Sequence, residues 1–167
     1  MIKLTINSGK NIVLLDDSDY ERISKFNWYV TPYGTVYRSY HTRTQYGKKK
    51  SIKVSMANEI MQTTKVLYDH ENRNSFDNQK SNLRQASYRQ NRMNVSKQKN
   101  ASSIHKGVSW CGRLSSWKVS IKFNGKQTHL GYFKLEIDAA RAYNRKAIEL
   151  FTEFAALNVD EQGRILC

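Results

Sequence analysis

Residues 68–91 read YDHENRNSFDNQKSNLRQASYRQN, and this polar stretch contains the residue types from which a hydrolytic centre can be built. An imidazole with an unperturbed pKa of about 6.5, such as that of His70, can accept a proton near neutral pH. The carboxylate of Asp69 and the amide of Asn91 offer oxygens that suit a hard divalent cation and leave positions for water and phosphate. The stretch therefore predicts a general base close to metal ligands.

The spacing within this stretch resembles that of the HNH family, specifically the phage- and intron-associated homing endonucleases. The resemblance implies a ββα-metal module over about residues 66–93, with a first strand at 68–71 and a helix at 81–93. It also implies roles for four residues. His70 would be the general base, Asp69 and Asn91 would hold one divalent metal, magnesium or manganese, and Asn82 would orient the ring of His70.

Each part of the motif also has a purely structural interpretation. An isolated Asp-His pair is usually a surface turn, and Asn-rich stretches usually form loops. Asp77 or Ser81 could cap a following helix, of which Leu83 would be the first core residue. Arg84 could contact a phosphate or form an internal ion pair, and the sequence favours neither. Many members of the family have His-Arg in the run before a Glu-Ile-Met segment. In this chain residues 56–61 read MANEIM, so the upstream histidine is missing.

A second resemblance covers about residues 105–158, with HKGV at 105–108, WKVSI at 117–121, HLGYF at 129–133 and DAARAY at 138–143. These motifs are similar to those of the APETALA-type DNA-binding domain. That family has a three-stranded antiparallel sheet packed on one helix, with the sheet in the major groove. Early in this segment Ser109 and Cys111 stand where plant relatives tend to have Arg, so we expect a different target sequence.

The apolar periodicity supports the same fold independently. Residues 117–123 alternate apolar and polar, as a strand with one buried face requires, and Asn124-Gly125 favours a tight hairpin. Apolar residues recur at helical spacing over 135–151. From the polar strand faces we expect DNA contacts, some of which could instead be solvated charges. These candidates are Lys106, Arg113, Lys118, Ser120, Lys122, Lys126 and Thr128.

Charge indicates a nucleic-acid partner. The formal net charge is +14, and residues 78–135 contain twelve Lys or Arg and no Asp or Glu, while residues 22–58 contain eight more and again no acid. Such runs are the electrostatic footprint of a duplex binder. No basic amphipathic helix coincides with them, which argues against a membrane partner. We expect double-stranded DNA as the partner and no small-molecule substrate.

The length of 167 residues provides material for one or two small domains, and the two resemblances together imply an α+β fold. We expect an HNH domain at residues 1–93, whose β-rich platform at 1–56 carries possible phosphate contacts at Arg38, Arg43 and residues 48–50. A basic extended linker at 94–104 would place Lys97 and Lys99 on phosphates. An APETALA-type domain at 105–160 would follow. With only two cysteines, Cys111 and Cys167, we expect no structural zinc.

The function that these features predict is a site-specific, metal-dependent DNA endonuclease of homing type. We expect a monomer, and because a single active site per chain can cut only one strand per engagement, this monomer would nick the DNA. The absence of a signal-peptide pattern and of long apolar runs suggests a cytoplasmic protein in a phage-infected or bacterial cell. The alternative is a sequence-specific DNA-binding regulator that retains a decayed, non-catalytic HNH scaffold.

Overall fold

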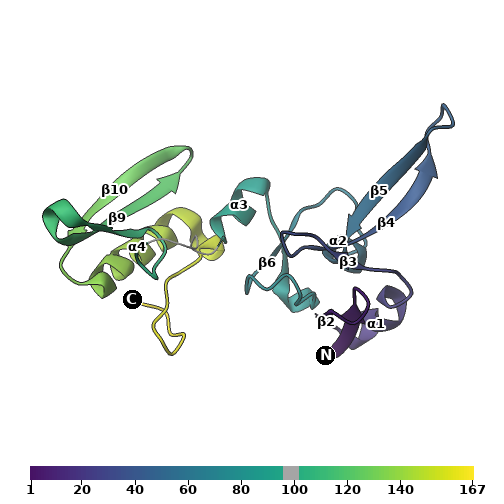
Figure 1. Ribbon diagram of the computed structural model, residues 1–167, viewed down its shortest axis with the longest axis horizontal. Coiled ribbons are helices and arrows are strands. Elements are labelled where there is room, and N and C mark those ends of the chain that lie inside the picture. The colour runs from purple at the N-terminus through teal and green to yellow at the C-terminus, as the bar shows by residue number, and fades with distance from the viewer. Residues whose placement is uncertain (96–101) are drawn as a thin grey trace. The chain divides into compact units, whose positions relative to one another are not determined.

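The computed structural model describes residues 1–95 and 102–167, which divide into two compact units, Met1–Tyr88 and Arg89–Cys167 (Figure 1). Lys97 and Lys99 lie outside the described residues. The mixed α+β class that the sequence predicts is confirmed, with several small antiparallel sheets and few helices. None of the helices in these two ranges has both the length and the apolar character needed to span a bilayer.

The first unit consists of three small sheets and two short helices. A hairpin at the N-terminus is followed by a helix, a three-stranded sheet in the order β3-β4-β5, a second helix and a further hairpin. These elements are β1 (Ile2–Ile6), β2 (Asn11–Leu15), α1 (Asp17–Ile23), β3 (Tyr29–Val30), β4 (Val36–Arg43), β5 (Lys49–Ser55), α2 (Met56–Ile60), β6 (Tyr68–His70), the 3-10 turn η1 (Lys80–Asn82) and β7 (Leu83–Gln85).

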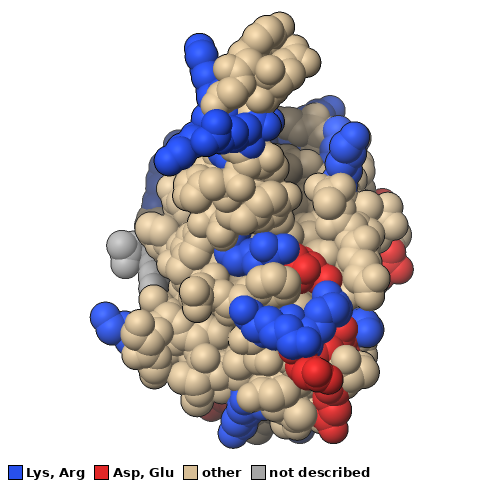
Figure 2. Space-filling view, turned by 90° about the vertical axis from the view of Figure 1, so that its right-hand side faces the viewer, with Lys and Arg blue, Asp and Glu red and all other residues tan. Residues whose placement is uncertain are grey.

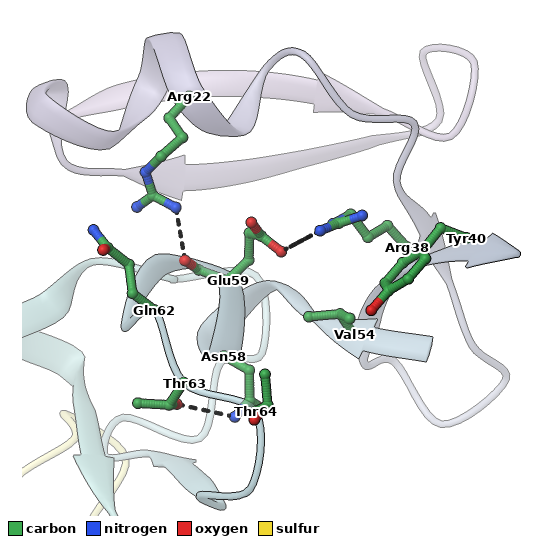
Figure 3. A pocket seen from close by; sticks show the side chains of 9 residues that line it. All are labelled: Arg22, Arg38, Tyr40, Val54, Asn58, Glu59, Gln62, Thr63 and Thr64. Atoms are coloured by element: carbon green, nitrogen blue, oxygen red, sulfur yellow. Dashed lines mark hydrogen bonds and ion pairs between the residues drawn. The ribbon is translucent and has the colours of Figure 1, made fainter. Parts of the chain in front are cut away.

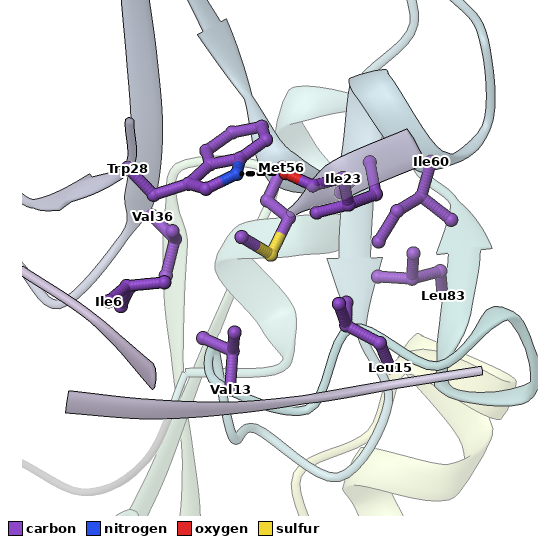
Figure 4. Packing of buried hydrophobic residues seen from close by; sticks show 10 residues of the cluster. Ile6, Val13, Leu15, Ile23, Trp28, Val36, Met56, Ile60 and Leu83 are labelled. Carbon is purple, nitrogen blue, oxygen red and sulfur yellow. Dashed lines mark hydrogen bonds between the residues drawn. The ribbon is translucent and has the colours of Figure 1, made fainter. Parts of the chain in front are cut away.

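One hydrophobic core joins these elements. Val13, Leu15, Ile23 and Met56 have no exposed surface, and Figure 4 shows side chains from β2, α1 and α2 pointing toward one another. The indole Nε1 of Trp28 donates a hydrogen bond of 2.8 Å to the carbonyl of Ile23, so this buried polar atom is satisfied. The short N-terminal hairpin is therefore an integral layer of the unit.

The predicted helix at residues 81–93 is shorter than expected. Residues 83–85 form β7, which pairs antiparallel with β6, and the helix α3 begins only at Tyr88 and ends at Met93. Leu83 is 7% exposed and packs in the core of the first unit. Pairing with β6 directs Leu83 into that core, so tertiary packing overrides the helical pattern.

The second unit contains the three-stranded antiparallel sheet that the sequence predicts, in the order β10-β9-β8, with a long helix packed against β9. Val119 in β9 and Ala139, Ala140 and Ala147 in α4 are fully buried, and the small alanines allow close approach of the helix. After α3, the elements are β8 (Val108–Cys111), η2 (Gly112–Leu114), β9 (Ser116–Phe123), β10 (Lys126–Phe133), α4 (Glu136–Phe151) and η3 (Thr152–Phe154).

The close packing around Gly107 leads to a specific prediction for the stability of the second unit. Its φ is +76°, and an added Cβ would lie 2.1 Å from the ring of Tyr143 and 2.8 Å from the carbonyl of Ser120. Gly125 has a similar φ of +79° but open space around its Cβ position. We expect Gly125→Ala to lower the free energy of unfolding by about 1–2 kcal/mol, because alanine is strained in the left-handed backbone. We expect Gly107→Ala to lower it by about 1–3 kcal/mol more than Gly125→Ala does, because the added methyl group also overpacks the site. Urea unfolding measures both, and equal costs would contradict this packing.

Candidate active site

The β6–β7 hairpin places Asp69 beside Arg84. The two residues are cross-strand partners, and Nε and Nη2 of Arg84 donate hydrogen bonds of 3.0 and 2.8 Å to Oδ2 of Asp69. Nη1 of Arg84 also lies 3.8 Å from Oε1 of the more exposed Glu71. Asp69 is 4% exposed, so this carboxylate depends on its cationic partner. Of the two interpretations of Arg84, the structure shows the internal ion pair.

The ring of His70 meets Asn78. Nε2 of His70 lies 3.2 Å from Oδ1 of Asn78, and Nδ2 of Asn78 donates to the carbonyl of Ser75 at 3.1 Å, which fixes the orientation of the amide. Because an amide oxygen can only accept, Nε2 of His70 is the donor. A neutral ring in this tautomer carries its lone pair on Nδ1.

Among the described residues, the structure places Asn78 rather than Asn82 against the ring of His70. Oδ1 of Asn82 accepts a 2.9 Å hydrogen bond from the backbone of Asn72, and its Nδ2 donates one of 2.7 Å to the carbonyl of Asp77. Asn82 thus fastens both ends of the loop between β6 and β7. The sequence contains the Asp77-Asn78 pair in the motif, but only the folded loop shows that Asn78 reaches the histidine.

Burial is the largest influence on the titration of His70. It lowers the pKa below the ordinary value of 6.5, and it outweighs the Asn78 hydrogen bond and the negative charges of Asp69 and Asp77, which raise the pKa. The neutral form of His70 is therefore favoured at pH 7, and this is the form that can accept a proton.

The two residues predicted to bind a metal ion belong to different units of the chain. Asp69 is on β6 in the first unit, while Asn91 is on α3 in the second. No group of three or more His, Cys, Asp and Glu side chains within the described ranges could hold a metal ion. The carboxylate of Asp69 suits a magnesium-type ion by its chemistry, because such ions take one or two carboxylates and complete their shell with waters and phosphate oxygens.

In the second unit, the pairing of β9 with β10 divides the predicted DNA contacts between the two faces of the sheet. Lys118, Ser120 and Lys122 share the face of β9 turned away from the core positions Val119 and Ile121. Their cross-strand partners on β10 lie on the same face. These partners, which the sequence interpretation missed, are Tyr132, His129 and Gln127. The rings of His129 and Tyr132 contact each other at a tilt of 58°, with their centroids 4.6 Å apart.

Lys126 and Thr128 lie on the opposite face from the one predicted. They pair with Phe123 and Ile121, which contribute to the core. The cause is a register shift between His129 and Gly131, because one extra residue in a strand reverses the face of every residue beyond it. Simple alternation counted back from Phe133 cannot reveal this shift.

Two further predicted contacts have distinct surroundings. Arg113 is exposed in the short turn η2. Nζ of Lys106 donates hydrogen bonds of 2.9 and 2.6 Å to the carbonyls of Met93 and Val95. Lys106 therefore satisfies backbone carbonyls at and just beyond the C-terminal end of α3, where a cation is favourable.

A pocket of about 520 Å³ lies near the base of β4 and β5 (Figure 3). Its cations already have internal partners. Arg22 donates a 2.7 Å hydrogen bond to the carbonyl of Glu59, and Arg38 donates two hydrogen bonds, of 2.9 and 2.7 Å, to Oε2 of Glu59. The pocket contains none of the predicted catalytic residues, and its polar contacts hold α1, β4 and α2 together.

The chain is 33% identical over 138 residues to an uncharacterized HNH endonuclease of Acanthamoeba polyphaga mimivirus, and the match covers 81% of this chain and 68% of that protein. No family model and no solved structure matches the chain.

The surroundings of His70 predict its titration. We expect the ring of His70 to titrate below pH 6.5, because burial opposes the charged form. We expect Asn78→Asp to raise this pKa, because the new carboxylate adds a negative charge at the same ring nitrogen. Histidine NMR titration, with His70→Gln to assign the signal, measures both values, and thermal unfolding confirms that the variant is folded. A wild-type pKa at or above 6.5 would contradict this description of the site.

Proposed function

The chain belongs to the HNH endonuclease family, and on that basis we propose that it is a site-specific, metal-dependent DNA endonuclease of homing type. The β6–β7 hairpin would cut the DNA and the sheet of the second unit would select the site. The observation that carries this proposal is the partly buried His70, which is held by Asn78 and follows directly after Asp69 in β6.

His70 supplies the general base in this proposal. With Nε2 engaged by Asn78, Nδ1 accepts a proton from water, and the water oxygen then forms a bond to phosphorus as the leaving oxygen departs. The lowered pKa keeps the ring neutral at pH 7 and therefore ready to accept that proton. The fixed amide of Asn78 keeps the ring in one orientation, which reduces the entropic cost of aligning it with the water.

Asp69 and Asn91 are the proposed ligands of one magnesium or manganese ion. When bound, the ion would stabilise negative charge on the scissile phosphate and the leaving oxygen. Arg84 holds the Asp69 carboxylate through Oδ2 and so fixes its position within the hairpin. Asn82 supports the same site indirectly, because it fastens the loop that carries Asn78.

The second unit is the proposed site-selecting element, in line with the APETALA-type resemblance of its sequence. One face of its sheet carries Lys118, Lys122, Gln127 and His129, which combine positive charge with hydrogen-bonding groups. A sheet with such a face can read base edges in the major groove. The substrate is accordingly proposed to be double-stranded DNA, nicked in one strand by a monomer.

One observation favours a second candidate, a DNA-binding regulator with a decayed HNH scaffold. The carboxylate proposed as a metal ligand already has a guanidinium at Oδ2, so its charge is compensated without a metal. In that case the basic surfaces would bind DNA while the hairpin served as a scaffold only.

Cleavage of supercoiled plasmid and phage-genome DNA separates the two candidates. With magnesium or manganese we expect open-circular product, and with chelator we expect none. We expect His70→Ala to lower the rate by roughly 10²–10⁴-fold, the usual contribution of a general base. If no metal gives product while salt-sensitive, sequence-selective binding persists, the regulator is the correct assignment.

A matched pair of lysines tests the site-selecting face. Lys122 and Lys126 are both exposed and lie four residues apart, but they occupy opposite faces of the sheet. We expect Lys122→Gln to reduce the slope of log K against log salt by about 0.9, the value for one lost phosphate contact, and Lys126→Gln to leave it nearly unchanged. Fluorescence anisotropy with duplex DNA measures both slopes. Equal effects of the two substitutions would rule out this assignment of the face.

A further inference from the structure

We propose that the β4–β5 hairpin of the first unit is a second DNA-binding element, which enters the major groove with one basic face toward the DNA. This inference rests on the proposed function only in taking duplex DNA as the ligand. It assigns the contact to a surface separate from the sheet of the second unit and from the β6–β7 hairpin.

The hairpin extends well beyond its supported base. β3 pairs only with Tyr37 and Val36, whereas the β4–β5 pairing continues from Ser39↔Lys53 to Arg43↔Lys49. Five residue pairs at about 3.4 Å each give a projecting ribbon of roughly 17 Å. Figure 1 shows this ribbon projecting from the rest of the unit. Its turn is closed by a 2.9 Å hydrogen bond from the backbone of Thr44 to Lys48.

The two faces of the ribbon differ in chemistry. Directly opposed residues of an antiparallel pair share a face. One face carries six polar or basic side chains, all of them exposed, and the other carries the exposed Tyr40 and Lys50 and the partly buried Thr42 and Ile52. The members of the exposed face, hereafter the basic face, are Ser39, His41, Arg43, Lys49, Ser51 and Lys53.

The cations of the basic face differ from several other cations of the first unit, which form ion pairs. Arg22, Arg38 and Lys80 form ion pairs with Asp19 or Glu59. In the described part of the chain, no acidic side chain lies within ion-pair distance of Arg43, Lys49 or Lys53. Figure 2 shows Lys and Arg around the projection at the top of the view, and Lys and Arg beside acidic residues below.

The base of the hairpin is fixed by one arginine. Arg38 binds Oε2 of Glu59 in α2, and its guanidinium lies 4.1 Å from the ring centroid of Phe26 and 5.3 Å from that of Tyr40. The ribbon is therefore anchored to the core elements at one end and exposed at the other. An anchored ribbon loses less conformational entropy on binding than a flexible loop would.

A two-stranded ribbon is an element that the major groove of B-DNA, about 12 Å wide, can admit. The paired arrangement places Arg43 and Lys49 side by side near the tip and Lys53 closer to the base, so cations on one face could meet successive phosphates and base edges. Lysines on exposed strands also prevent edge-to-edge pairing. That role, which Lys50 on the other face can also serve, does not require Arg43, Lys49 and Lys53 to share a face from which apolar side chains are absent.

The first test compares two triple variants of the full chain, each in the His70→Ala background to prevent cleavage. Arg43, Lys49 and Lys53 are changed to Gln in one variant. The matched control changes three other exposed lysines of the same unit, Lys3, Lys10 and Lys25, to Gln. The probe is a 40-base-pair duplex of random sequence, and the salt dependence of its Kd is measured by fluorescence anisotropy.

We expect the hairpin variant to reduce the salt slope by about 2–3, as the loss of three phosphate contacts requires, and the control to change it by less than about 1. Equal changes would show that only net charge matters and would overturn the proposal, as would no change in either variant. If the wild type nicks plasmid and the hairpin variant matches the control, the hairpin assignment fails while the nuclease stands. If no metal supports nicking but the slopes differ as expected, the hairpin assignment stands while the nuclease proposal fails.

The second test locates the groove. Ser51, exposed at the centre of the basic face opposite His41, is changed to Cys in a protein whose Cys111 and Cys167 are replaced by Ser. Duplexes with a disulfide-linked thiol tether in the major or the minor groove are the probes, and Ser8→Cys in the β1–β2 turn is the control. We expect preferential cross-linking of Ser51→Cys to the major-groove tether. Equal or preferential minor-groove cross-linking would overturn the groove assignment.

Discussion

The candidate active site depends on the backbone pairing between β2 and the loop that follows His70. Leu14 donates a 2.8 Å hydrogen bond to the carbonyl of Phe76, and the backbone of Asn78 donates one of 2.9 Å to the carbonyl of Leu14. These bonds act together with those of the Asn82 side chain to hold a polar loop of this length in one conformation. With them, Asn78 is fixed within reach of the His70 ring. The N-terminal hairpin therefore supports the site although it contributes no catalytic group.

The parts of the fold that follow from local chemistry could be predicted from the sequence. Turn residues at Asn7 to Gly9 and at Asn124-Gly125 mark two hairpins, and strict alternation marks β9. The parts decided by long-range contacts could not. Leu83 joins a strand because the core of the first unit accepts its side chain, and the faces of β10 depend on one irregular residue near Leu130.

The same distinction applies to the candidate site. The sequence identifies Asp69 and His70 as neighbours with the chemistry of a hydrolytic centre, but it cannot show which of several asparagines meets the ring. Asn78 does so because of the pairing with Leu14, while Asn82 fastens the loop. The ion pair of Asp69 with Arg84 likewise arises from strand register, since the two residues lie 15 positions apart in sequence.

Both proposed DNA contacts in this protein are faces of small antiparallel sheets. Each face carries cations on alternate residues, while the other side is supported by core packing or by an anchored base. Sheets of this kind position side chains more firmly than loops do, which favours contacts at defined spacing. In the proposed function, the β6–β7 hairpin needs no strong affinity of its own if such surfaces hold the DNA.

The central claim is that His70, kept neutral by burial and oriented by Asn78, is the general base that deprotonates the attacking water. The most direct test is the pH dependence of the single-turnover nicking rate of the wild type and of Asn78→Asp, compared with the NMR titration of His70 in the same preparations. Because the base must be unprotonated, we predict that the rate rises with pH through an inflection below 6.5 in the wild type and at higher pH in the variant, matching the NMR value in each. An inflection that stays in place when the pKa of His70 moves would contradict this account.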